Sequence, residues 1–228
     1  MTNMKQIIAK AIDHAVLHPI HTTKDLEKNC LICKKYNVAS ICVKPHHIKE
    51  AKNLLSDSEV LISTVIDFPH GNNPTEIKIK QIIKTIEDGA EEVDAVINIS
   101  KVIEHDWDYI SKEVEQMTNI THEQNKIIKI IFETCYLDNY MIEKLTKICN
   151  KYKADYVKTS TGFGFIKQEN GLYKSYGANI DVVKIMLDNS DYCKVKASGG
   201  IRDFKTAELY INMGVKRLGT SSTEQILS

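Results

Sequence analysis

Eight short apolar runs recur along this chain, and segments of helical periodicity separate most of them. The runs span residues 11–16, 40–43, 61–66, 93–97, 127–132, 156–158, 195–197 and 217–219. One of the intervening segments has the apolar stripe of an amphipathic helix, formed by Ile77, Ile79, Ile82, Ile83 and Ile86. Strands that alternate with helices are typical of repeated βαβ units, and such units build a parallel sheet.

Eight repeats in 228 residues fit an α/β chain that closes into a (β/α)8 barrel, the TIM barrel. The alternative is an open doubly wound sheet, which usually has fewer strands. No linker, low-complexity segment or block of charge divides the chain. We therefore predict a single barrel domain over residues 1–228.

The overall charge argues against partners that are bound by bulk electrostatics. Lys plus Arg and Asp plus Glu both number 30, so the formal net charge is zero, which gives no support for binding nucleic acid or a membrane. No apolar run approaches the length needed to span a bilayer. The first ten residues lack the apolar core of a signal peptide.

The six cysteines have the pattern of reduced intracellular thiols, so we expect a cytoplasmic location. Cys30 and Cys33 share a face with Leu26 in a helix-like segment, which favours core residues over a redox or metal site. We expect the clustered histidines to be loop and strand-end residues and not metal ligands; they are His14, His18, His21, His46 and His47. We expect neither a metal nor a cofactor.

Two lysines end short apolar runs in similar settings. Lys158 lies in Tyr-Val-Lys-Thr-Ser-Thr-Gly, and Lys196 lies in Val-Lys-Ala-Ser-Gly-Gly. An amine that is walled by apolar residues loses proton affinity, and a second cation nearby lowers that affinity further. A neutral amine can form a Schiff base with a carbonyl compound. Either lysine alone is typical of a surface charge at a strand end. The pair indicates carbonyl chemistry, in which one lysine is the nucleophile and the other is a cation that lowers the pKa of the first.

Other polar residues fall where a barrel has its active site, at the carboxyl ends of the strands. Strand alternation puts Asp94 on one face with Val96 and Asn98, and a carboxylate inside an apolar run is either paired with a cation or functional. Barrel geometry could bring Asp94, Lys158 and Lys196 together. The apolar runs or their ends also contain Asp13, Cys42 and Glu133.

Two glycine-bearing loops follow the last two runs, with Ser-Gly-Gly-Ile-Arg at 198–202 and Gly-Thr-Ser-Ser at 219–222. Glycines let backbone N–H groups approach an anion, and a helix N-terminus adds a favourable dipole. Taken singly, the first loop is typical of a turn, and Ser221 is typical of a helix N-cap. Because the loops after strands seven and eight of a barrel often bind phosphate, the two together predict a phosphate site.

With these motifs the chain resembles the deoxyribose-phosphate aldolases, a family of class I, Schiff-base aldolases with a (β/α)8 fold. The resemblance runs almost end to end. Its specific motifs are Val-Asp-Ala-Val-Ile-Asn at 93–98, Val-Lys-Thr-Ser-Thr-Gly-Phe-Gly at 157–164 and Val-Lys-Ala-Ser-Gly-Gly-Ile-Arg at 195–202. Shorter matches are Ile-Asp-His at 12–14, Ile-Cys-Val at 41–43, Thr-Val-Ile-Asp-Phe-Pro at 64–69, Glu-Thr-Cys at 133–135 and Gly-Thr-Ser-Ser at 219–222.

The resemblance implies a role for each residue of the site. It implies that Lys158 is the Schiff-base lysine and that Lys196 is the neighbouring cation that lowers the pKa of Lys158. Asp94 would work with Lys196 and a water in proton transfer, and Asp13 would support that network. The residues expected to hold the phosphate are Gly199, Gly200, Ser221 and Ser222. Further substrate contacts are expected at Cys42, Thr159 and Gly162.

The reaction implied by the resemblance is the reversible cleavage of 2-deoxy-D-ribose 5-phosphate into D-glyceraldehyde 3-phosphate and acetaldehyde. The expected partners are therefore a small sugar phosphate and aldehydes. Members of the family are often dimers, so a homodimer is a further expectation.

Three features depart from the family pattern. Ala15 stands where the family usually has Thr, residues 164–177 form a longer segment than the usual glycine loop, and the chain lacks the Tyr-ended tail of some members. The longer segment, which contains Lys167 and Lys174, is expected to overhang the phosphate side of the active-site mouth. These departures bear on rate and substrate preference more than on the class of reaction.

Two other functions remain open. A class I aldolase of the transaldolase type would also use a barrel lysine, although it fits the paired-lysine motifs less well. A sugar-phosphate-binding barrel without enzymatic activity would bind the ligand without capturing it covalently.

Overall fold

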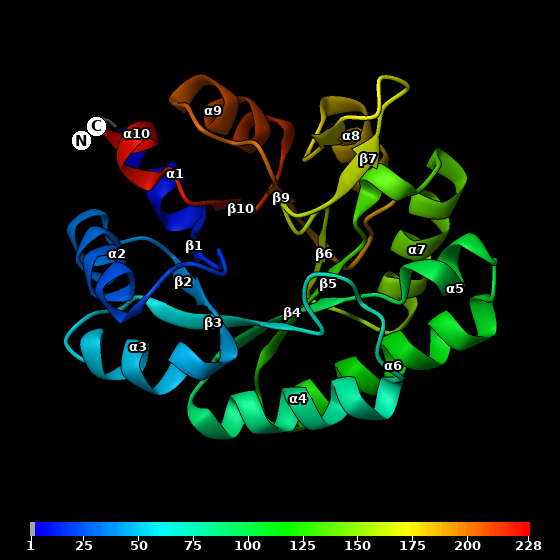
Figure 1. The fold of residues 1–228 in the computed structure, drawn as a ribbon, viewed down its shortest axis with the longest axis horizontal. Coiled ribbons are helices and arrows are strands. Elements are labelled where there is room, and N and C mark those ends of the chain that lie inside the picture. The colour runs from blue at the N-terminus through cyan, green and yellow to red at the C-terminus, as the bar shows by residue number, and fades with distance from the viewer. Residues whose placement is uncertain (1–2) are drawn as a thin grey trace.

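The computed structural model describes residues 3–228, and these form a closed barrel of eight parallel strands (Figure 1). Around the barrel the order is β1, β2, β3, β4, β5, β6, β9 and β10, and β10 pairs with β1 to close it. The bounds are β1 Ile12–Val16, β2 Ser40–Val43, β3 Leu61–Ile66, β4 Glu92–Val96, β5 Ile127–Ile131, β6 Tyr156–Lys158, β9 Lys194–Ser198 and β10 Arg217–Thr220. All eight coincide with the apolar runs, so the TIM barrel is confirmed and the open doubly wound sheet is wrong.

Helices surround the barrel (Figure 1). They are α1 Asn3–Ala11, α2 Thr23–Tyr36, α3 Ile48–Leu54, α4 Thr75–Asp88, α5 Ile99–Ile103, α6 Trp107–Glu123, α7 Asn139–Lys151, α8 Ile180–Asp188, α9 Phe204–Met213 and α10 Thr223–Leu227. Two 3₁₀ turns, η1 Pro45–His47 and η2 Thr134–Tyr136, follow β2 and β5. Within the described part of the chain, no helix combines the length and apolar character that crossing a membrane requires.

The apolar face of α4 is narrower than the sequence predicts. Ile82 is fully buried, and Ile79 and Ile86 pack against the core beside it. Ile77 and Ile83, which the predicted stripe includes, are 36% and 37% exposed. Helical residues advance by about 100° each, so a residue next to Ile82 lies far around the helix from the face that Ile79, Ile82 and Ile86 share. On α2, Cys30 and Cys33 are both buried in the core, as expected.

Strand alternation separates an apolar layer outside the barrel from a polar layer inside it. On β5, Ile128 and Ile130 belong to the core between strands and helices, while Lys129 between them points inward. Strand register then sets charged side chains beside one another: Asp94 pairs with Lys129, and Lys158 pairs with Lys196. The interior of the barrel therefore contains a row of ionisable groups.

The long segment at 164–177 folds into an antiparallel hairpin of β7 Phe165–Lys167 and β8 Tyr173–Ser175, a two-stranded sheet separate from the barrel (Figure 1). The Phe165 N–H donates to the Tyr136 hydroxyl at 3.0 Å, which ties the hairpin to η2. At its far end the segment returns to the barrel where Gly177 approaches Gly199 so closely that a Cβ on Gly177 would lie 2.2 Å from the Gly199 carbonyl oxygen.

Candidate active site

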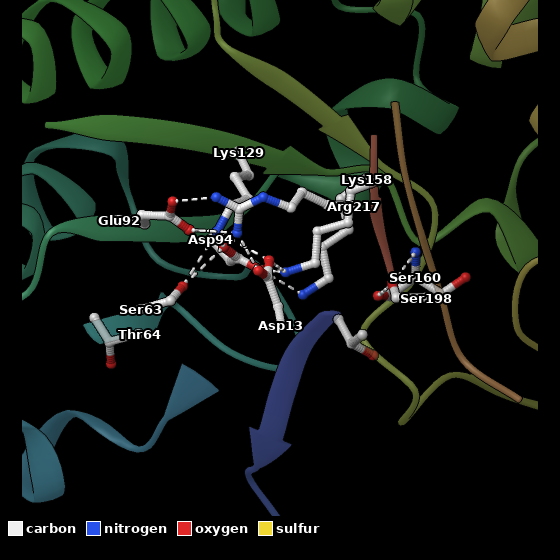
Figure 2. Close-up of polar contacts among 12 residues, drawn as sticks. Asp13, Ser63, Thr64, Glu92, Asp94, Lys129, Lys158, Ser160, Ser198 and Arg217 are labelled. Carbon is white, nitrogen blue, oxygen red and sulfur yellow. Dashed lines mark hydrogen bonds and ion pairs between the residues drawn. The ribbon is translucent and has the colours of Figure 1, made fainter. Parts of the chain in front are cut away.

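The charged groups inside the barrel form one connected layer (Figure 2). Six strands or strand ends supply its members, all of them buried: Asp13, Glu92, Asp94, Lys129, Lys158, Lys196 and Arg217. Buried charges are costly unless they are paired and hydrogen-bonded, so the pairing pattern decides which of them bear charge.

Asp94 is the centre of this layer. Its Oδ2 accepts from the Nζ atoms of Lys158 and Lys196, each at 2.7 Å. Its Oδ1 accepts from Lys129 at 2.9 Å and from the Ser63 hydroxyl at 3.3 Å. The three residues that the sequence singles out are thus in direct contact, and one carboxylate bridges the two lysines.

Asp13 lies next to Asp94 and shares a partner with it. Its Oδ2 pairs with Lys196, and its Oδ1 pairs with Arg217. Oδ1 also accepts from the Ser40 hydroxyl at 2.8 Å. Lys196 is therefore held between two carboxylates, those of Asp13 and Asp94.

Sequence reasoning missed the other three members of the layer. Lys129 contacts Glu92 at 2.5 Å and Asp13 at 3.2 Å in addition to Asp94. Arg217 NH2 contacts Glu92 Oε1 at 2.7 Å. A signal for Lys129 was present, since a lysine between Ile128 and Ile130 is a charge inside an apolar strand, the same reason that singled out Asp94.

Counting charges in the layer leaves one cation without a carboxylate of its own. Three carboxylates face four basic side chains. Lys196 and Lys129 are each shared by two or more of the carboxylates, and Arg217 pairs with two. Lys158 contacts only Asp94. Among these seven residues, charge balance is reached when Lys158 is an uncharged amine that donates a hydrogen bond to Asp94. The nearby carboxyl group of Glu133, which also interacts with Lys158, has a pKa raised by burial.

The pKa shifts have the directions that this count requires. Burial lowers the pKa of Lys158, Asp94 opposes that effect, and the charge of Lys196 adds to the lowering. Burial also acts to lower the pKa of Lys196, but Asp13 and Asp94 together raise it above its ordinary value. For Asp94, burial acts to raise the pKa, and Lys129, Lys158 and Lys196 outweigh it and hold the pKa well below its usual range.

A cavity of about 390 Å³ opens above these lysines at the carboxyl ends of the strands. The sequence-predicted site residues that line it are Asp13, Cys42, Lys158, Gly162, Lys196, Gly199, Gly200, Ser221 and Ser222. Ala15 and Phe165 also line it, so the base of the hairpin forms part of the wall. Lys167 and Lys174 do not.

Two predicted site residues lie outside the cavity lining. Asp94 is fully buried behind the lysines that it bridges. Thr159 is engaged elsewhere: its hydroxyl donates to the Ser198 carbonyl and accepts from the Ser198 N–H, both at 3.0 Å. The Thr159 hydroxyl thus joins β6 to β9, and Thr159 does not line the cavity.

The glycine loops at the cavity edge have the backbone that glycine favours. Gly199 and Gly200 have φ values of 89° and 82°, which other residues adopt only with strain. A Cβ on Gly200 would meet nothing within 4 Å, so its backbone faces open space. In the neighbouring loop the Ser222 N–H donates to the Thr220 hydroxyl at 2.9 Å, which leaves the Ser222 hydroxyl as the group available to a ligand.

Glu133 holds the loop that follows Lys158. This carboxyl group is buried, and burial raises its pKa. It accepts from the Thr161 hydroxyl and from the Thr161 N–H, the latter at 3.2 Å from Oε2. Thr161 Oγ1 in turn accepts from the Phe163 N–H at 2.9 Å. Phe163 then packs edge-on against Phe68, with ring centroids 5.4 Å apart, which closes one side of the cavity.

Comparison with known proteins agrees with this architecture. The model of the DeoC/LacD family of aldolases matches residues 7–213. Proteins named deoxyribose-phosphate aldolase are similar over nearly the whole chain. The one from Treponema denticola is 41% identical, with 93% of this chain and 94% of that protein covered, and the one from Thermococcus gammatolerans is 39% identical, with 96% and 95% covered.

Solved structures are similar over the same extent. A structure described as "QR15, an Aldolase" has a TM-score of 0.88 at 34% identity and covers 100% of this chain and 95% of its own. The deoxyribose phosphate aldolase of Aeropyrum pernix, described as having a unique tetrameric structure, has a TM-score of 0.86 at 27% identity, with 98% and 90% covered. This chain belongs to the DeoC/LacD family of aldolases and is an aldolase, a lyase.

Proposed function

We propose that this enzyme catalyses the reversible cleavage of 2-deoxy-D-ribose 5-phosphate into D-glyceraldehyde 3-phosphate and acetaldehyde through a Schiff base on Lys158. The observation that carries the proposal is the position of the Lys158 amine, which contacts only Asp94 in the charged layer and lines the cavity. The substrate is taken from the relatives, which are named deoxyribose-phosphate aldolase.

Lys158 fits the role of nucleophile better than either neighbouring lysine. Lys196 pairs with two carboxylates and Lys129 with three, and both have a raised pKa despite burial. An amine in that state is protonated and has no lone pair to attack a carbonyl. Lys158 has a lowered pKa, caused by burial and by the charge of Lys196, and it lines the cavity, so its neutral form is more accessible than that of Lys196 or Lys129.

In the cleavage direction the Lys158 amine attacks the C1 aldehyde of the open-chain sugar to give a carbinolamine. The carbinolamine then loses water to form an iminium ion. The C3 hydroxyl then gives up its proton, the bond between C2 and C3 breaks, and its electron pair moves into the iminium to give an enamine. Glyceraldehyde 3-phosphate leaves, the enamine takes a proton at C2, and water releases acetaldehyde. Asp94 and Lys196, within 2.7 Å of each other and adjoining Lys158, are the groups placed to move protons.

The cavity suits a substrate of this size and charge. Lys158 and Lys196 line it together with Cys42 and Gly162. Gly199 and Gly200 also line it, as do Ser221 and Ser222 of the following loop, and we assign the phosphate to these two loops. In this assignment the reacting aldehyde lies at Lys158 and the phosphate at the two loops.

Product analysis tests the proposal. The enzyme is incubated with 2-deoxy-D-ribose 5-phosphate, and acetaldehyde and glyceraldehyde 3-phosphate are measured, with Lys158→Leu as the inactive control. Release of the two products in equal amounts supports the proposal. Transfer of a dihydroxyacetone unit from fructose 6-phosphate, with no acetaldehyde formed from the deoxy sugar, would identify a transaldolase-type enzyme. Binding of the sugar phosphate without turnover would identify a binding protein.

A further inference from the structure

A tight turn after β1 brings two histidine rings to the wall of the cavity. The turn spans His18, Pro19, Ile20 and His21, and the His21 N–H donates to the His18 carbonyl at 3.0 Å. Proline at the second position of such a turn presets the backbone. The rings of His18 and His21 lie 5.6 Å apart, and both residues line the same cavity as Lys158.

Neighbouring elements hold this turn in place. Lys44, which follows β2, donates from Nζ to the His21 carbonyl at 2.7 Å and to the His18 carbonyl at 3.5 Å. The ring of His18 also packs against Phe163, with centroids 6.3 Å apart. The backbone of the turn is therefore held by Lys44, and the ring of His18 is also held by Phe163.

Both histidines retain hydrogen-bonding capacity that the protein does not use. The Ile20 N–H points to His18 Nδ1 at 3.4 Å, which favours the tautomer with hydrogen on Nε2 and leaves that N–H as a donor. His21 Nδ1 is buried and has no hydrogen-bond partner among the described residues. Asp25 faces His21, but its carboxylate already accepts from the Thr22 N–H and hydroxyl at 2.7 and 2.8 Å.

The histidine turn lines the same cavity as the loops assigned to phosphate. β1 pairs with β10, with His14 opposite Thr220, and the segments that follow these two strands contribute His18 and His21 on one side and Ser221 and Ser222 on the other. Among the described residues that line the cavity, Asp13 is the only acidic one, and it is paired with Lys196 and Arg217. The wall around these segments consequently offers hydrogen-bond donors and basic groups without a competing carboxylate.

We propose that His18 and His21 are phosphate-recognition residues, which donate hydrogen bonds to the phosphate monoester of the substrate alongside the backbone of the glycine loops. This inference rests on the proposed function. It adds two imidazole donors to the backbone N–H groups, the serine hydroxyls and the Arg202 side chain that also line the cavity. Charge-assisted bonds of this kind are about twice as strong as neutral ones, so each ring is expected to matter measurably.

The test uses His18→Phe and His21→Phe, which keep an aromatic ring for packing and remove the donors. Each is expected to raise the KM for 2-deoxy-D-ribose 5-phosphate about 10-fold, the effect of losing one charge-assisted bond, with kcat little changed. With unphosphorylated 2-deoxy-D-ribose, kcat/KM stays near the wild-type value. His46→Phe is the matched control, because His46 is an exposed histidine in η1, after β2, and does not line the cavity.

A second measurement separates this proposal from the choice of substrate. Binding of inorganic phosphate, followed by calorimetry, requires no aldol chemistry, and it should weaken in both histidine variants and not in His46→Phe. Weaker phosphate binding together with absent cleavage of the deoxy sugar would leave the histidine site standing and overturn the proposed substrate. Unchanged phosphate binding, or equal losses with both sugars, would show that the rings only shape the cavity and would overturn the histidine site.

Discussion

At the scale of single residues, the chemistry of this enzyme depends on the different surroundings of two lysines. Lys158 and Lys196 share Oδ2 of Asp94 at 2.7 Å, yet only Lys196 has the additional carboxylate of Asp13. That one extra partner gives the two amines pKa shifts of opposite direction. In the proposed mechanism, Lys158 is therefore the nucleophile, and Lys196 is the cation beside it.

Replacing Lys196 should therefore alter turnover and its pH dependence more than binding. Lys196→Leu removes a positive charge that lowers the pKa of Lys158, so Lys158 holds its proton to higher pH and the optimum of the residual activity moves upward. Turnover is expected to fall about 10²–10⁴-fold, with a much smaller change in affinity for the sugar phosphate.

The pH profile of kcat/KM measures this effect, because it reports groups of the free enzyme, and Lys194→Leu is the control because Lys194 lies on the same strand with its side chain exposed. Near-normal turnover with an unchanged optimum in Lys196→Leu would contradict the tuning role.

Lys129 should contribute mainly to stability. Its amine is in contact with Asp13, Glu92 and Asp94, and removing one partner of a buried network leaves uncompensated charge. Lys129→Met is expected to lower the free energy of unfolding by about 3–5 kcal/mol, measured by urea denaturation. The exposed Lys80→Met should change it by less than about 0.5 kcal/mol. Equal stability of the two variants would mean that the carboxylates do not depend on Lys129.

The site residues that the sequence identifies and those that it misses differ in how unusual their charge is at that position. Asp94, Lys158 and Lys196 are charged residues within or at the end of apolar runs, and the cost of burying a charge there singles them out in the sequence. Arg217 and Glu92 lie at the first positions of β10 and β4, where a charged residue is ordinary in a sequence. Only closure of the barrel, which places Arg217 NH2 2.7 Å from Glu92, reveals their part in the layer.

At the scale of elements, the loops at the carboxyl ends of the strands occupy different parts of the site. The loops after β9 and β10 border the region assigned to phosphate, and the loop after β6 is held by Glu133. The hairpin of β7 and β8 was not predicted as strands, because three-residue strands in a polar segment leave little periodicity to detect. Its expected position at the mouth agrees with Phe165, which lines the cavity.

Phosphate binding should depend on Gly200 and not on the hairpin. Gly200 has a φ of 82°, so Gly200→Leu strains a loop that must present its backbone to the phosphate, and the KM for 2-deoxy-D-ribose 5-phosphate should rise about 10-fold or more. The unphosphorylated sugar should be affected far less. Replacing residues 166–174 by a short glycine-serine link, which keeps the cavity-lining Phe165, should leave that KM within about 3-fold, since Lys167 and Lys174 do not line the cavity.

Steady-state kinetics with both sugars distinguishes these cases. Loss of phosphate preference in the shortened enzyme, combined with a harmless Gly200→Leu, would show that the phosphate lies under the hairpin instead of at the glycine loop.

At the scale of the whole molecule, the closed barrel is what assembles the site. Lys196 and Asp13 are 183 residues apart in the chain, and Lys158 and Asp94 are 64 apart, yet all four meet inside the barrel. The alternation of apolar runs and helical segments is sufficient to predict that fold, because a strand-like run recurs eight times along the chain, as a (β/α)8 barrel requires. The pairing inside the barrel and the histidine turn depend on strand register and loop geometry, which periodicity does not contain.

The central claim is that Lys158, and no other lysine, forms the covalent intermediate. Incubation with acetaldehyde followed by borohydride reduction should add an ethyl group to one lysine, and peptide mass mapping identifies it. We predict modification at Lys158, its absence in Lys158→Leu, and persistence of some labelling in Lys196→Leu at raised pH. Labelling of Lys196 alone, or of no lysine, would contradict the assignment.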